Sequence, residues 1–140
     1  MIQRIQSIWL LLASVAAFLT LKVPFFSGNQ LDTVTNTKQF VLLNAMSSIW
    51  LLILTVAVGV ASLVALFLFK DRKRQLLVVS AIVVVALLNI VLYFSETKHF
   101  AEGNINLTSL LAFSIPLWLA LALRGIWKDE QLVKSTNRLR

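Results

Sequence analysis

Long apolar stretches that contain no charged residue alternate along the chain with short segments that carry most of its charges. A helix needs about 20 mainly apolar residues to cross a lipid bilayer, and four of these stretches approach or reach that length. Inside a bilayer an open strand leaves its backbone groups without partners, so we expect helices. The predicted spans are residues 5–21, 49–69, 75–95 and 106–123, with an outer loop at residues 22–48 and a tail at residues 124–140.

The outer loop is open to two interpretations. Its polar segment Ser27–Gln39 is bracketed by the apolar segments Val23–Phe26 and Phe40–Leu43. These brackets can pair as short extended segments, or they can continue the neighbouring helices. We favour an ordinary loop at the membrane interface over a hairpin cap, and we expect Phe40–Ser48 to extend or lead into the second helix.

Composition supports the membrane interpretation. Of the 140 residues, 59% are apolar and 14% are charged, whereas soluble domains carry about 25% charged and about 45–50% apolar residues. A soluble chain of this size has too little interior to bury so much apolar surface. We therefore predict an all-α fold, an integral membrane four-helix bundle whose partner and solvent is the lipid bilayer.

The positions of the basic residues predict the orientation of the bundle. Ten of the 13 Lys and Arg residues lie in segments 1–4, 70–74 and 124–140, and three lie in the segments between them. Cytoplasmic segments carry the excess of Lys and Arg, so both termini are expected in the cytoplasm. The residues expected to bind lipid head groups are Lys70, Arg72, Lys73 and Arg74. RNA, ribosomes or an acidic protein surface are alternative targets of this charge, but no specific nucleic acid is expected.

Small and polar residues inside the spans are candidates for helix packing, because small side chains let helices approach closely in lipid. These candidates are Thr55, Ala57, Gly59, Ala61, Ala65, Asn89 and Pro116, together with Ala13, Ala16, Ala17 and Thr20 in the first span. We expect Asn89 to hydrogen-bond to a hydroxyl group on another span. Its candidate partners are Ser14, Ser62 and Ser114. Pro116 removes one backbone hydrogen bond, which predicts a kink in the last span.

The chain lacks the residues that several classes of membrane protein use. No Asp, Glu, Lys, Arg or His lies inside a predicted span, which weighs against proton-coupled antiporters, haem-binding helices and aspartate or zinc intramembrane proteases. The single histidine, His99, shares an outer loop with Glu96 and Glu102, which are too few ligands for a typical metal site. We expect no catalytic, metal or cofactor site, and no enzymatic activity.

The two ends of the chain resemble a known family. The opening Met1-Ile2-Gln3-Arg4-Ile5-Gln6 and the closing Lys128-Asp129-Glu130, Leu132-Val133 and Arg138-Leu139-Arg140 are similar to the ends of an uncharacterised family of short four-span bacterial membrane proteins. That family is classed by a domain of unknown function. The resemblance implies a bacterial inner-membrane protein with four helices, and it carries over no activity and no site residues.

Both of these end segments fall on the predicted cytoplasmic side. They form one docking surface for a larger partner, or they serve only as topology signals; the sequence leaves both open. The candidate docking residues are Gln3, Arg4, Gln6, Lys128, Asp129, Glu130, Arg138 and Arg140. The leading hypothesis is a non-enzymatic accessory or structural subunit of a larger inner-membrane complex. The alternative is a small channel or transporter, including one formed by a homo-oligomer.

Overall fold

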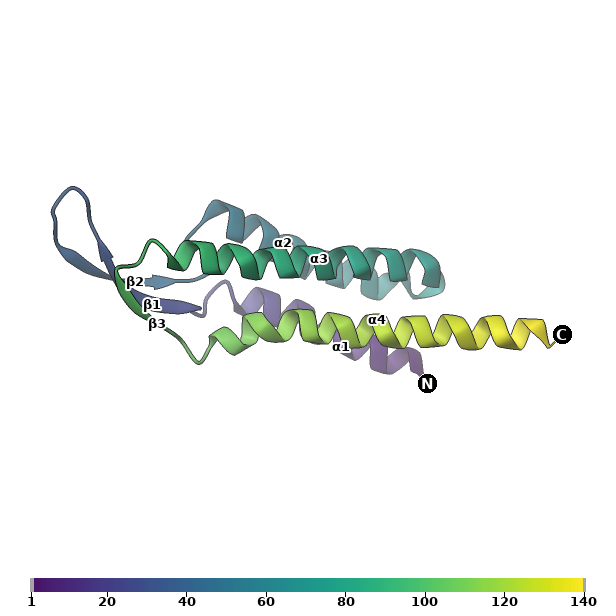
Figure 1. Cartoon of the computed structure of the whole chain (residues 1–140). Coiled ribbons are helices and arrows are strands. Elements are labelled where there is room, and N and C mark those ends of the chain that lie inside the picture. Colours follow the sequence, from purple (N-terminus) through teal and green to yellow (C-terminus); the bar gives the residue numbers. More distant parts are fainter. Residues whose placement is uncertain (1, 140) are drawn as a thin grey trace.

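The computed structural model describes residues 2–139, which form a bundle of helices with a small sheet at one end (Figure 1). The described residues contain four α-helices, α1 (Ile2–Leu19), α2 (Ile49–Phe67), α3 (Arg72–Thr97) and α4 (Ser109–Arg138), and a 3-10 helix, η1 (Leu68–Lys70). They also contain three strands, β1 (Phe26–Leu31), β2 (Lys38–Leu43) and β3 (Glu102–Ile105). The fold is therefore mostly helical, but it is not the all-α fold that we predicted, because it contains these three strands.

Three of the helices are long and apolar enough to cross a membrane. They are the residues Ile49–Lys70, Arg72–Thr97 and Ser109–Arg138, and the apolar part of α1, Ile5–Leu19, is shorter. In the most apolar window of each long helix only 33%, 28% and 33% of the residues are buried. About two thirds of each window faces outward, which fits helices that are solvated by lipid rather than by water.

The four helices form a ring in which each packs against two neighbours. α1 contacts α2 and α4, and α3 contacts the same two helices from the opposite side. Small side chains let α1 sit deep in the bundle, because Ala13, Ala16 and Ala17 are all buried as predicted. The rest of the main core consists of Leu10, Val58, Ala65, Val79, Ile82, Ala86, Ile115, Leu119, Ala122 and Ile126.

Two of the three strands, β1 and β2, lie in the segment that we expected to be an interfacial loop. The strand order of the sheet is β2-β1-β3, and both pairs are antiparallel, with Phe26 opposite Leu43 and Ile105. The brackets of the polar loop thus pair as a hairpin. Phe40–Leu43 lies in β2, so this segment does not extend α2 as one of our two alternatives predicted, and residues 44–48 lead into that helix. The hairpin turn is closed by Asp32, whose side chain accepts from the Val34 amide at 3.1 Å, and by Asn36 at φ 54°.

Two glycines allow β1 and β3 to pair. Gly28 lies opposite Gly103, and a Cβ added at Gly28 would lie 2.6 Å from the Gly103 Cα. A side chain there would collide with backbone, which cannot give way as a flexible side chain can. The close approach of the two strands therefore requires glycine at position 28.

An aromatic cluster fixes the sheet to the bundle. The Phe25 ring stacks on the Tyr93 ring of α3 with centroids 4.4 Å apart, and the Phe26 ring packs edge-on against Phe100 at 5.1 Å. Leu43, at the end of β2, is also buried in this second core. Because aromatic pairs contribute about 0.5–1.5 kcal/mol beyond their buried area, the sheet is a docked cap and not a loose loop.

Candidate docking surface and polar core

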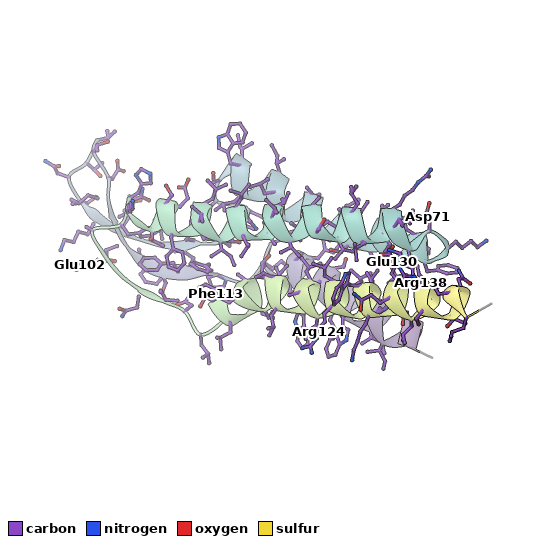
Figure 2. The ribbon with its side chains drawn as sticks, turned by 45° about the vertical axis from the view of Figure 1, so that its right-hand side comes forward. Asp71, Glu102, Phe113, Arg124, Glu130 and Arg138 are labelled. Carbon is purple, nitrogen blue, oxygen red and sulfur yellow. The ribbon has the colours of Figure 1, made fainter. Side chains whose placement is uncertain are left out.

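The start of α1, the turn between α2 and α3, and the last turns of α4 lie together at the end of the bundle opposite the sheet (Figure 1). We call this region the terminal end. Figure 2 shows Asp71, Glu130 and Arg138 at this end and Glu102 at the other. The structure thus brings the two recognisable segments of the sequence to one place. The side chains of the predicted docking residues Gln3, Arg4 and Arg140 lie outside the described part of the chain.

Gln6 and Asp129 join α1 to α4 at the terminal end. The Gln6 Nε2 donates to the Asp129 Oδ2 at 2.9 Å, and the two residues are only 5% and 7% exposed. A Cβ added at Gly125 would lie 2.9 Å from the Gln6 Cγ, so the glycine makes room for the glutamine. Both residues are buried and bonded to each other inside the bundle, so their side chains are not on its surface; a docking role for them stays a prediction.

The acidic side chains of the terminal end all have partners among the described residues. Besides Asp129, the Asp71 Oδ2 pairs with the Arg74 Nε at 3.1 Å, and the Glu130 Oε1 pairs with the Lys134 Nζ at 3.1 Å. In the described chain this pairing leaves a group of exposed cations with no acidic partner. They are Lys70, Lys73, Arg124, Lys128 and Arg138.

An open hollow of about 770 Å³ separates the turn between α2 and α3 from the last turns of α4. Three of the four predicted lipid-binding residues line it, namely Lys70, Arg72 and Lys73. Arg72 also reaches across, since its Nη1 lies 3.5 Å from the Asp129 backbone oxygen. The fourth residue, Arg74, pairs with Asp71 instead. The hollow therefore presents more positive than negative charge.

The last part of α4 has no covering element in the described structure. Every residue from 131 to 139 is exposed, and α4 continues beyond the turn that joins α2 to α3 (Figure 1). The segment carries apolar side chains, with Leu132, Val133 and Leu139 at 53%, 43% and 89% exposure. We call residues 131–139 the α4 tail. The predicted tail is thus a direct continuation of the last span.

The predicted packing residues fall on two different faces of α2. Thr55, Gly59 and Ala65 are buried, whereas Ala61 is half-buried and Ala57 is exposed. A spacing of four residues turns about 40° past one full helical turn, so a line of such residues drifts around the helix. The three alanines therefore do not form one contact line, and the packing role of Ala57 in this bundle is wrong.

Gly59 lies at a close contact between α1 and α2. A Cβ added there would lie 2.9 Å from the Phe18 Cζ, and the Ser14 Oγ donates to the Gly59 backbone oxygen at 3.0 Å. This contact satisfies the serine hydroxyl inside the bundle. Gly59 therefore lies in the contact between these two helices, where a larger side chain would meet Phe18.

Asn89 has a partner that the sequence analysis missed. Its Nδ2 donates to the Thr55 Oγ1 at 3.0 Å, and the three serines proposed as partners donate to backbone oxygens instead. Antiparallel helices joined by a short turn face each other at equal distances from the turn, and positions 55 and 89 are equally far from position 72. That symmetry is the signal that could have found the pair.

Two further positions complete this account of the core. Gln75 was missed; its Nε2 donates to the Ala65 backbone oxygen at 3.0 Å, which ties α3 to α2 near their turn. Pro116 is half-buried inside α4, which continues through it as one helix.

Among residues 2–139 no group of three or more His, Asp or Glu side chains could hold a metal ion.

These features define a class of protein: a small, mostly helical chain with three helices that could span a membrane, capped by a three-stranded sheet. More particularly, the chain belongs to the family described as Domain of unknown function (DUF4293), whose model matches residues 2–139. No curated protein and no solved structure matches the chain.

Proposed function

We propose that this protein is a non-enzymatic accessory subunit of a bacterial inner membrane that binds a larger complex through its terminal end. In this proposal the chain crosses the membrane four times, with both termini in the cytoplasm and the sheet outside. The excess of Lys and Arg at the terminal end supports this orientation. The short α1 crosses with help from its flanking cations, since long basic side chains extend to the membrane surface.

The exposed α4 tail is the observation that carries the proposal. Leu132, Thr136 and Leu139 follow one another at intervals of four and three residues, which places them on one face of the helix. Val133 lies beside them, on the side of α4 that faces the hollow. A short helix that buries none of its apolar side chains gains little stability in water. A partner that covers this face would supply the missing packing.

The hollow beside the tail supports a second contact, with anionic lipid. At the cytoplasmic surface each Lys or Arg near the head groups contributes about 1 kcal/mol of attraction. Lys70 and Lys73 are exposed there, and their charges are not neutralised within the described chain. This contact holds the terminal end at the membrane surface, with the α4 tail pointing away from it toward a partner.

The test is purification of the full chain from native membranes in mild detergent, with an affinity tag inserted in the exposed hairpin turn at residues 33–36. We expect a stoichiometric protein partner that is lost when Leu132 and Leu139 are both replaced by serine. The matched control is Leu31→Ser, which removes an apolar side chain about as exposed as that of Leu132 (50% against 53%) at the other end of the molecule. Recovery of an isolated bundle, or a partner retained by the double variant, would overturn the proposal.

The alternative function, a small channel or transporter, has Asn89 and Pro116 at its pathway. In the structure Asn89 is 5% exposed and faces a chamber of about 10 Å³, which has room for a single water molecule. A pathway for larger solutes would therefore have to lie between copies of the chain. Flux in reconstituted liposomes that is lost on Asn89→Leu would promote this alternative over the first.

A further inference from the structure

Four polar side chains converge inside the bundle near the sheet. Thr20 directly follows α1, Thr55 lies on α2, and Asn89 and Tyr93 lie one turn apart on α3. They are 5%, 1%, 5% and 1% exposed, respectively. All four line one enclosed chamber of about 10 Å³, whose remaining wall is apolar and includes the small residues Ala17, Ala86 and Ala112.

Two polar atoms of this cluster are not used by its hydrogen bonds. The Asn89 Nδ2 donates to the Thr55 Oγ1 at 3.0 Å, and the Thr20 Oγ1 donates to the Ala17 backbone oxygen at 2.6 Å. The Asn89 Oδ1 and the Tyr93 hydroxyl are buried and have no hydrogen-bond partner among the described residues. Buried polar groups in proteins are almost always satisfied, so each such atom requires an explanation.

The two leftover atoms are chemically complementary. An amide oxygen only accepts, whereas a tyrosine hydroxyl can donate. Exchanging the two ends of the Asn89 amide would not remove the problem, because Thr55 can satisfy only one end and the other would still face the chamber. The cluster therefore offers one donor and one acceptor to a small polar molecule.

We propose that the chamber is a binding site for one buried water molecule, which accepts from the Tyr93 hydroxyl and donates to the Asn89 Oδ1. A single water needs about 10–15 Å³ of accessible volume and two to four polar partners, and the chamber provides both. The Thr20 and Thr55 oxygens are further acceptors on the same wall. None of the lining residues is charged, which favours a neutral molecule over an ion.

This water has a structural consequence for the outer end of the bundle. Tyr93 carries the stacked ring of Phe25, which immediately precedes β1. A hydrogen bond from the Tyr93 hydroxyl adds a restraint to a ring that is also held by packing. The bound water therefore connects the α2–α3 pair, through Asn89 and Thr55, to the aromatic cluster that holds the sheet.

The experiment uses the full chain in detergent micelles and combines two measurements. The first is the nuclear Overhauser effect between water and the methyl groups of Ala86 and Ala112, which line the chamber. Ala13 and Ala65 are the controls, since they are fully buried away from the chamber. We expect cross-peaks from a long-lived water at the two chamber methyls and none at the controls. Equal cross-peaks at all four methyls, or none at the chamber, would overturn the proposal.

The second measurement is the effect of Tyr93→Phe on the folding equilibrium in mixed micelles. This variant keeps the ring that stacks on Phe25 and removes only the hydroxyl. With a bound water we expect the folding equilibrium constant to fall about five- to tenfold and the chamber cross-peaks to disappear. In a dry chamber the change would remove an unsatisfied group and stabilise the fold. A direct bond from Tyr93 to Asn89, Thr20 or Thr55 would give the loss of stability without the cross-peaks, and either result contradicts the proposal.

Discussion

The contact between Gln6 and Asp129 joins segments 123 residues apart in the chain, and its removal gives the sharpest test of how the terminal end is held. The perturbation is a double-mutant cycle of Gln6→Ala and Asp129→Ala. Each single change leaves the other polar group buried without its partner. The double variant removes both groups, so the cycle isolates the energy of the contact from the cost of burying an acidic side chain.

The magnitude follows from the geometry. The donor and acceptor are 2.9 Å apart in a buried pair, and hydrogen bonds to charged groups contribute about 1.5–3 kcal/mol. We therefore expect a coupling energy of about 1.5–3 kcal/mol. The control cycle uses Lys38→Ala and Glu102→Ala, a pair at 3.2 Å whose side chains are 53% and 66% exposed. Exposed pairs contribute about 0.2–1 kcal/mol.

The assay is reversible unfolding of each variant in mixed micelles, followed by tryptophan fluorescence. The stacked rings of Trp9 and Trp118, with centroids 5.1 Å apart, join α1 to α4 and report on this interface. A coupling energy for Gln6 and Asp129 no larger than that of the control cycle would refute the reasoning. It would mean that the two side chains are solvated in the folded protein and do not hold α1 against α4.

Three further changes test other parts of the structure. Gly59→Leu should lower the stability of the bundle by about 1–3 kcal/mol, because the added side chain overpacks the contact with α1. Ala57→Leu on the exposed face should change the stability by less than about 0.5 kcal/mol. Unfolding in mixed micelles measures both changes. Gly28→Val should open the β1–β3 pairing, seen as faster amide hydrogen exchange in both strands, and unchanged exchange would contradict the close approach described above. Lys73→Gln should reduce the amount of anionic phospholipid that co-purifies with the protein, measured by native mass spectrometry, whereas Lys98→Gln at the opposite end should not. An equal loss of phospholipid in both variants would contradict a site in the hollow.

The helices could be predicted from the sequence because each depends on a local property, a long run of apolar residues without charge. The span predicted at residues 49–69 falls on α2 and the 3-10 helix that follows it for that reason. The burial of Gly59 and of the alanines of α1 was also predictable, since small residues in lipid-facing helices favour close packing. The drift of a four-residue spacing around the helix explains why Ala57 did not follow them.

The sheet and the hydrogen bonds depend on contacts that a local pattern does not contain. β1 joins β3 across about 70 residues, and nothing in the four residues of β3 distinguishes them from a loop. Nothing in the sequence around the polar residues Gln6 and Asp129 indicates burial, yet they hydrogen-bond to each other inside the bundle. Asn89 was recognised as a packing residue, but its partner Thr55 depends on the alignment of α2 with α3.

The orientation of the terminal end is the claim on which the proposed function depends, and the chain contains no cysteine that would interfere with its measurement. The test places a single cysteine either in the α4 tail, as Ser135→Cys, or in the hairpin turn, as Thr35→Cys, and treats intact cells with a thiol reagent that cannot cross the inner membrane. We predict that Thr35→Cys is labelled in intact cells and that Ser135→Cys is labelled only after the cells are permeabilised. Labelling of Ser135→Cys in intact cells would place the α4 tail outside the cytoplasm and contradict the account.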